Sequence, residues 1–277
     1  MVGSSFFLCM ENDSIANART IIDFVVLQLK KKWILEGEEV ENLGSEFAGA
    51  VEPWALVFVS NLEHIEYVVN EKMAQVPHGD GQNIWNERKY LDAIRLCHVE
   101  NIHELRAILS GFHLHALASE SHNKSPNLLE WIESEKDGQP PCVMVVMDLL
   151  DLQLSSDLAQ SGTKDQGTAT VTGEVYLPET SGQMNADPKR YLQIKLAGLS
   201  HTLAALEESR HYLNGYYRQR WETNLGFSDY RETDLLVTSK DSTGVLEDDE
   251  QTDLTSEEKI GWKNIHRVLL YYIEQVI

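Results

Sequence analysis

The sequence contains few cysteines and no long apolar run. Its three cysteines, Cys9, Cys97 and Cys142, lie far apart and match neither the spacing of a zinc site nor an even disulfide set. Such a chain is expected in a reducing compartment. No apolar stretch approaches the roughly 20 residues that a membrane-spanning helix needs. The N-terminus lacks the basic start of a signal peptide, so none is predicted.

Positive charge is also scarce, because 23 Lys and Arg residues face 44 Asp and Glu residues, a formal net charge of -21. A phosphate backbone repels an acidic protein, which disfavours nucleic-acid binding by this chain alone unless its basic residues cluster. The stretches 36–46 and 247–258 contain neither Lys nor Arg. They are expected to be solvated, with residues 247–255 forming an acidic loop.

Helical and strand-like patterns alternate along the chain. Strands are predicted at 52–61, 90–99, 142–152 and 234–242, and helices at 14–35, 62–76, 101–119, 191–213 and 256–277. This alternation predicts an α/β fold with a mostly parallel sheet flanked by helices, in a single domain spanning 1–277. Residues 155–189 are rich in Ser, Thr, Gly and Asp and are expected to form a mobile insertion.

The stretch "CVMVVMDLLDL" (142–152) has an apolar run that meets Asp148 and Asp151. In nucleotide hydrolases an Asp after a buried strand holds a metal-bound water, but those enzymes also need a Gly-rich loop ending in Gly-Lys-Ser/Thr. No Gly-Lys pair occurs in the chain, and "CMENDS" (9–14) places acids before the first predicted helix. Asp148 is therefore expected to end a strand, with no metal and no nucleotide cofactor bound.

Other catalytic patterns are missing as well. His113 and His115 are two positions apart, so they do not share a helix face. No Gly-x-Ser-x-Gly motif and no cysteine-centred signature occurs. No catalytic residue and no metal ligand is predicted.

The segment "RHYLNGYYRQRW" (210–221) interleaves basic and aromatic residues. Aromatic rings stack on unpaired bases, and Arg adds charge and cation–π contacts. The candidate DNA contacts are Arg210, Tyr216, Tyr217, Arg218, Arg220 and Trp221. The alternative is an aromatic helix end that packs on the sheet while its arginines reach into solvent.

The C-terminal helix carries large apolar residues at alternating spacings of three and four. These residues are Trp262, Ile265, Leu269, Tyr272 and Val276. Aromatic residues on one stripe suit a protein–protein interface, so this stripe is a candidate partner-binding surface. Core packing is the alternative explanation.

Taken together, the core resembles the RecA-type ATPase fold with a degenerate catalytic apparatus. The stretch "RKYLDAIRLCHVENIHELRAIL" (88–109) is similar to a recombinase-paralogue strand and helix, and "PPCVMVVMDLLDL" (140–152) resembles the hydrophobic strand with a terminal Asp, matched by Asp148. The segment "DLLVTSKDS" (234–242) resembles the strand that follows. The last helix is similar to that of the Csm-type subunit of the Shu complex.

The resemblance implies a nuclear, non-catalytic accessory subunit of a recombination or DNA-repair complex. Such a pseudo-ATPase would bind a recombinase paralogue in a hetero-oligomer, assist recombinase filament assembly and touch DNA through the partner complex. Two alternatives remain: an inactive RecA-fold subunit of an Elongator-type tRNA-modification complex, and a doubly wound α/β enzyme with an unrecognised site. Against the enzyme, "SNLEH" (60–64) has no Gly after the predicted strand 52–61.

Overall fold

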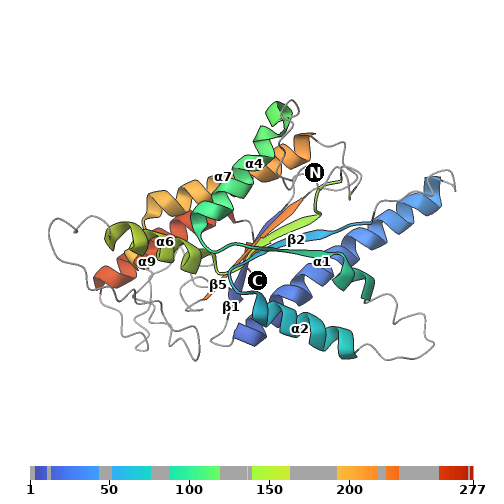
Figure 1. Cartoon of the computed structure of the whole chain (residues 1–277), viewed down its shortest axis with the longest axis horizontal. Helices are drawn as coiled ribbons and strands as arrows, with labels where there is room; N and C mark the ends of the chain where they lie inside the picture. Colours follow the sequence, from blue (N-terminus) through green and yellow to red (C-terminus); the bar gives the residue numbers. More distant parts are fainter. Residues whose placement is uncertain are drawn as a thin grey trace, which may run out of the picture.

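The computed structural model has an α/β fold built on one sheet (Figure 1). It describes residues 4–10, 14–43, 52–75, 88–118, 136, 139–162, 192–216, 223–230, 256–273 and 275–276. The strands among them are β1 (Ser5–Met10), β2 (Ala55–Val59), β3 (Ile94–His98), β4 (Val143–Val146), β5 (Asn224–Tyr230) and β6 (Gln275–Val276). The helices are α1 (Ser14–Leu43), α2 (Leu62–Gln75), α4 (Ile102–Ala118), α6 (Leu149–Gly162), α7 (Leu196–Tyr216) and α9 (Ser256–Tyr272).

The strands lie side by side in the order β3-β2-β4-β5-β1-β6, and each neighbouring pair is parallel. Parallel neighbours require long crossover connections, which the helices supply. Strand β1 pairs with β5 on one side and β6 on the other. The predicted α/β class, with a mostly parallel sheet flanked by helices, is confirmed.

Helices cover both faces of the sheet. Figure 1 shows α1 and α2 on one side of the strands and α4, α6, α7 and α9 on the other. On the first side, ion pairs join the helices, since Arg19 Nη2 lies 2.8 Å from Glu71 Oε2 and Lys72 Nζ lies 2.6 Å from Asp23 Oδ1. The core lies between these two helix layers and the sheet.

The central strands β2 and β4 consist of consecutive buried residues. Strands that are covered on both faces have continuous apolar sequences rather than alternating ones. This is why "ALVFV" and "VMVV" could be recognised from their composition. The predicted strand 52–61 contains β2, and the predicted strand 90–99 contains β3.

Gly226 in β5 allows α1 to pack closely on the sheet. A Cβ atom at this position would lie 3.1 Å from Val145 Cγ2 and 3.2 Å from Phe24 Cε1. Phe24 also packs edge-on against Phe6 of β1, with ring centroids 5.4 Å apart. A side chain at position 226 would therefore push α1 away from β4 and β5.

The predicted strand 142–152 is wrong in its second half. Strand β4 ends at Val146, and helix α6 begins at Leu149. The apolar run continues across this junction because Leu149, Leu150 and Leu152 are buried on the helix. Because the sequence is apolar on both sides of residues 147–148, its composition did not indicate that the strand ends there and a helix begins.

The predicted mobile insertion at 155–189 is also wrong at its beginning. Helix α6 continues to Gly162, and Ser156 and Asp157 on it are buried. Their burial is made possible by hydrogen bonds to neighbouring helices, which composition alone does not reveal. Residues 163–191 lie outside the described part of the chain.

Strands β1 and β5 were not predicted. The sequence of β5 (NLGFSDY) mixes apolar residues with Gly226 and polar residues, so it has no clear strand pattern. The predicted strand 234–242 and the predicted acidic loop 247–255 lie outside the described residues.

Three helices differ from the prediction by several residues at one or both of their ends. Helix α1 begins at Ser14 as expected but continues to Leu43, and the helix predicted at 191–213 is α7, from Leu196 to Tyr216. The predicted C-terminal helix 256–277 stops at Tyr272, because the chain then adds β6 to the sheet beside β1.

Replacing Gly226 with alanine should lower the free energy of unfolding by about 1–3 kcal/mol, because the new methyl group overpacks the contact with Phe24 and Val145. Chemical denaturation measures this loss. Gly111 in α4 is the matched control, because no atom lies within 4 Å of a Cβ built there. Gly111→Ala should stabilise the protein by about 0.5–1 kcal/mol. Equal changes in the free energy of unfolding at positions 226 and 111 would contradict the close packing of α1 on the sheet at Gly226.

Candidate functional site

The carboxyl end of the sheet is the first place to look for a site. In open α/β sheets, ligands bind where neighbouring strands lead to helices on opposite faces. Strands β2 and β4 are such neighbours, since α2 follows β2 on one face and α6 follows β4 on the other (Figure 1). The residues at this point are Asn61 after β2 and Asp148 after β4.

Side chains at this edge cap the helices that follow the strands. Asn61 Oδ1 accepts a hydrogen bond from Glu63 N at 2.9 Å, at the start of α2. Asn101 Oδ1 accepts from His103 N and Glu104 N, each at 3.0 Å, at the start of α4. These side chains satisfy the unpaired amides of helix N-termini, which is a structural role.

Asp148 occupies the turn between β4 and α6. Its φ angle is 52°, in the left-handed region, and its carbonyl oxygen accepts a hydrogen bond from Leu152 N at 2.9 Å. Asp adopts this conformation more readily than most residues. Among the described residues, no group of three or more His, Cys, Asp or Glu side chains is placed to hold a metal ion.

The described cysteines are poorly suited to nucleophilic chemistry. Burial raises the pKa of the Cys97 thiol, and the carboxylate of Glu104 raises this pKa further. A raised pKa keeps the thiol protonated at neutral pH, whereas the reactive form is the thiolate. Cys142 is fully buried before β4.

The structure contradicts a DNA contact at Arg210. This residue is 2% exposed, and its guanidinium group forms an ion pair with Glu207. Arg210 is among the buried residues of α7, which packs against α4 and α9. The backbone of Tyr216 ends α7, while the side chain of Tyr216 and all of Tyr217, Arg218, Arg220 and Trp221 lie outside the described set.

The structure also contradicts a partner interface at Ile265 and Leu269. Their exposed fractions are 2% and 1%, because this face of α9 packs on the core beside α7. Tyr272 is half-buried, and its carbonyl oxygen accepts a hydrogen bond from Ser5 Oγ at 2.7 Å. The side chains of Trp262 and Val276 lie outside the described set. The core-packing alternative therefore holds for Ile265 and Leu269.

The opposite face of α9 is open to solvent. Ile260 is 59% exposed and Tyr271 is 82% exposed, and Lys263 and Arg267 lie between them on the exposed side. Large apolar side chains at this exposure, next to charged residues, are a feature of interaction surfaces. The large apolar side chains that α9 exposes therefore lie on the face opposite to Ile265 and Leu269.

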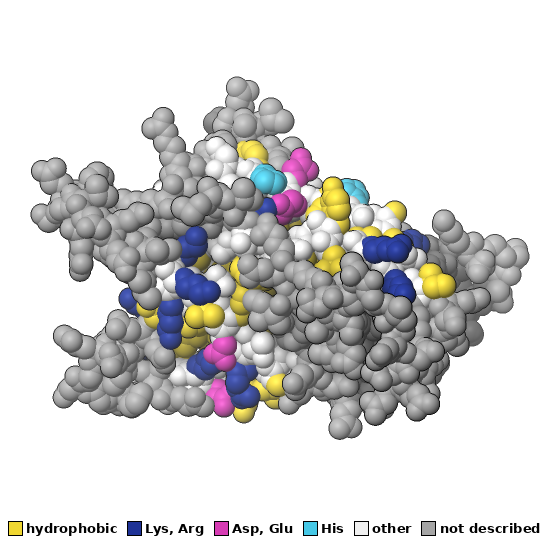
Figure 2. Space-filling model, turned by 180° about the vertical axis from the view of Figure 1, so that it is seen from behind, with side chains coloured by type: hydrophobic (Ala, Val, Ile, Leu, Met, Phe, Trp, Pro, Cys, Tyr) yellow, Lys and Arg dark blue, Asp and Glu magenta, His cyan; other side chains and the backbone are white. Residues whose placement is uncertain are grey.

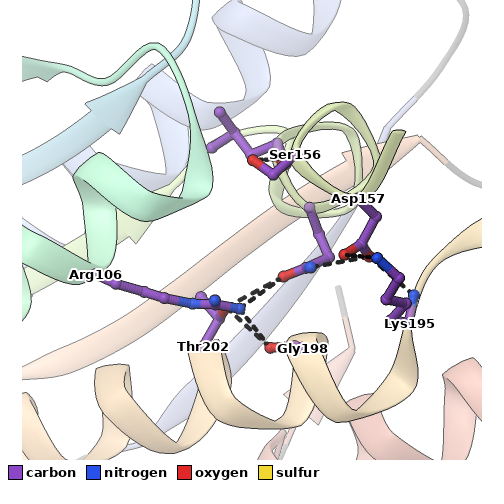
Figure 3. A network of polar contacts seen from close by, with 8 residues as sticks. Arg106, Ser156, Asp157, Lys195, Gly198 and Thr202 are labelled. Carbon is purple, nitrogen blue, oxygen red and sulfur yellow. Dashed lines mark hydrogen bonds and ion pairs between the residues drawn. The ribbon is translucent and has the colours of Figure 1, made fainter. Parts of the chain in front are cut away.

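A polar network that the sequence did not predict joins three helices (Figure 3). Arg106 of α4 donates from Nε to Thr202 Oγ1 at 2.9 Å, and from Nη2 to Gly198 O at 2.7 Å and Gln153 Oε1 at 3.1 Å. Gln153 Nε2 donates to Asp157 Oδ2 at 3.0 Å. The network therefore runs from α4 through α6 to α7.

Asp157 connects the network to the start of α7. Its Oδ2 accepts a hydrogen bond from Lys195 N at 2.9 Å, and its Oδ1 lies 3.6 Å from Lys195 Nζ. Burial lowers the pKa of Arg106, and the Asp157 carboxylate opposes this shift. A Cβ atom at Gly198 would lie 2.7 Å from Gln153 Nε2, so a side chain there would displace the Gln153 amide from its place in the network. The network therefore joins α4, α6 and the start of α7.

A second unpredicted feature is a cluster of lysines and aromatic rings at the far end of the molecule from α9. Trp33 of α1 packs edge-on against Tyr90, with ring centroids 5.1 Å apart. Lys89 Nζ lies 4.6 Å from the Trp33 ring centroid and 5.0 Å from that of Tyr90. Lys30 Nζ lies 5.6 Å from the Tyr90 centroid. These four residues are called the lysine–aromatic cluster.

Asp148 offers a test of its backbone conformation. Asp148→Gly should be more stable than Asp148→Ala by about 1 kcal/mol, because only glycine adopts a φ of 52° without strain. The control is Asp151, in the first turn of α6. There the order should reverse, with alanine better than glycine by about 1 kcal/mol. The same order at both positions would refute the left-handed turn.

Thr202→Val should lower the free energy of unfolding by about 1–3 kcal/mol, because it removes a fully buried partner of Arg106 without changing the shape of the side chain. Urea denaturation measures the loss. Thr20→Val is the matched control, since Thr20 is exposed on α1 and bonds only to its own helix at Ala16 O. Its effect should stay within about 0.5 kcal/mol. A neutral Thr202→Val would show that the network contributes little.

Comparisons with known proteins do not assign the chain to a family. No protein-family model and no curated protein matched it. In the part of the chain that the structure describes, no helix has the length and apolar character needed to cross a lipid bilayer. Function must therefore be inferred from the residues and their arrangement.

Proposed function

We propose that the protein is a non-catalytic RecA-like subunit of a nuclear recombination or DNA-repair complex. It would bind a recombinase paralogue and assist the assembly of recombinase filaments through protein–protein contacts. The confirmed parallel sheet supports the fold part of this proposal. The resemblance of residues 88–109 and 140–152 to recombinase paralogues supports the pathway.

The connection between β1 and α1 carries the pseudo-ATPase part of the proposal. A phosphate loop joins a strand to a helix through the eight-residue pattern Gly-x-x-x-x-Gly-Lys-Ser/Thr. Here β1 ends at Met10 and α1 begins at Ser14, so only residues 11–13 connect them. Their sequence, Glu-Asn-Asp, has no glycine and no lysine, and its two acids would repel a triphosphate.

The position of Asp148 agrees with a catalytic apparatus that has been lost. Asp148 follows β4, as the terminal Asp follows the hydrophobic strand in the RecA-type proteins that the sequence resembles. In this chain it starts α6 through its carbonyl oxygen. Its φ of 52°, which Asp adopts more readily than most residues, gives this position a structural role that needs no phosphate loop.

The exposed face of α9 is the surface that we assign to the partner. Ile260 and Tyr271 provide apolar contact area there, and Lys263 and Arg267 provide charge. The buried face of the same helix is held by the core, so binding would leave Ile265 and Leu269 in place. A rigid helix that needs no rearrangement can bind at little entropic cost.

Affinity purification of the tagged protein from its native cells, followed by mass spectrometry, tests this proposal. A recombinase paralogue should be recovered in stoichiometric amount. Tyr271→Ala should reduce its recovery by about tenfold, since exposed aromatic anchors dominate interfaces. Tyr67→Ala is the control, because Tyr67 is 56% exposed on α2, across the sheet from α9. It should leave recovery unchanged.

An assay of ATP hydrolysis with the purified protein completes the test, and the expected result is no turnover above background. Hydrolysis abolished by Asp148→Asn but not by Asp151→Asn would refute the pseudo-ATPase. Recovery of tRNA-modification subunits in place of recombinase paralogues would move the protein to the Elongator-type alternative.

A further inference from the structure

The lysine–aromatic cluster (Lys30, Trp33, Lys89 and Tyr90) is the centre of a local positive surface. Lys31 and Lys32 follow Lys30 on α1, and Arg88 and Arg95 flank the other half of the cluster. Residues 30–32 and 88–95 contain six Lys or Arg and one acid, Asp92. Asp92 Oδ2 lies 3.6 Å from Arg88 Nε. The whole chain, in contrast, has a net charge of -21.

Two segments that are far apart in the sequence form this surface. Residues 88–90 precede β3, and Lys30 and Trp33 belong to the middle of α1. Figure 2, seen from behind, shows Lys and Arg side chains gathered on the left of that face, the end to which α1 extends in Figure 1. The surface lies on the amino-terminal side of β3, whereas Asp148 follows the carboxyl end of β4.

Packing explains how the positive charges are held together. Two ammonium groups, of Lys30 and Lys89, lie within cation–π distance of the single buried ring of Tyr90. The negative face of the ring offsets part of their mutual repulsion. Trp33 is only half-buried, so an aromatic surface remains beside the lysines. Charge and a partly accessible aromatic ring therefore occur at one place.

We propose that the lysine–aromatic cluster binds single-stranded nucleic acid. Lysine ammonium groups attract the phosphate backbone, and an accessible aromatic ring stacks on an unpaired base without selecting its identity. This inference deepens the proposed function, on which it rests, because it names the surface through which a recombination subunit would touch DNA. It replaces Arg210 as the contact, since Arg210 is buried.

The surroundings limit the size of this site. In the sequence after the cluster, residues 36–41 contain four Glu and neither Lys nor Arg, and this negative charge disfavours a long contact with a phosphate backbone. The contact is therefore confined to a few nucleotides. Binding should be weak at physiological salt, and it should strengthen steeply as the salt concentration falls.

The test is fluorescence anisotropy of a labelled oligothymidine of about 20 nucleotides with the full-length protein, between about 50 and 200 mM salt. The double variant Lys30→Gln/Lys89→Gln should bind about tenfold more weakly at the lowest salt concentration. Its slope of log K against log salt concentration should be less steep by about 1.4, the value for two lost single-strand phosphate contacts. Lys30→Arg/Lys89→Arg, which keeps both charges, should bind like the original protein.

Arg19→Gln/Lys72→Gln is the matched control, because it makes the same charge change on α1 and α2 outside the cluster. It should change the affinity by less than about twofold, since long-range charge effects are screened. An equal loss in this control would refute the site, as would no binding of the oligonucleotide. Binding of a polyglutamate peptide in place of the oligonucleotide would instead assign the surface to an acidic protein.

Two measurements separate failure of this inference from failure of the proposed function. Lys30→Gln/Lys89→Gln should still recover the partner in the affinity purification, because α9 is unchanged. If thermal denaturation shows that this variant does not fold, the anisotropy experiment uses Lys31→Gln/Lys32→Gln instead. That variant removes two neighbouring positive charges on α1. No loss of affinity in that variant would overturn the inference.

Discussion

The structure depends on the burial of β2 and β4 on both of their faces. A strand covered on both sides must satisfy its backbone polar groups within the sheet, so neighbouring strands have to pair along its full length. Two layers of helices are then needed to keep water from both faces. The parallel order of the strands, the long crossovers and the separation of α1 and α2 from the other helices all follow from this requirement.

The same requirement places different chemistry at the different surfaces of the molecule. At the carboxyl edge of the sheet, Asn61, Asn101 and Asp148 begin helices, so their polar groups serve the fold. Between the helices, the Arg106 network aligns α4, α6 and α7 through directional bonds in an otherwise apolar layer. The exposed charged side chains, such as Lys263 and Arg267, lie instead on the outer faces of the helices.

Much of the fold could be predicted, because β2, β4 and α4 have strong local patterns. The apolar runs of β2 and β4 and the cap at Asn101 need no information from distant residues. Strand β5 depends on pairing with β1 and β4 on its two sides. Its own sequence mixes apolar and polar residues, so it does not predict a strand. The lysine–aromatic cluster joins α1 to residues before β3. Because these two segments are far apart in the sequence, no motif of consecutive residues predicts the cluster.

The position of β1 between β5 and β6 has a consequence for the order of folding during synthesis. Among the described strands, β1 is synthesised first, and its two neighbours in the sheet begin only at Asn224 and Gln275. At about 5–20 residues per second, the nascent β1 would wait roughly 10–45 s before β5 is made. Meanwhile β2, β3 and β4 can assemble with their own helices. An apolar strand that stays unpaired for so long is a natural substrate for chaperones, which would then govern the yield of folded protein.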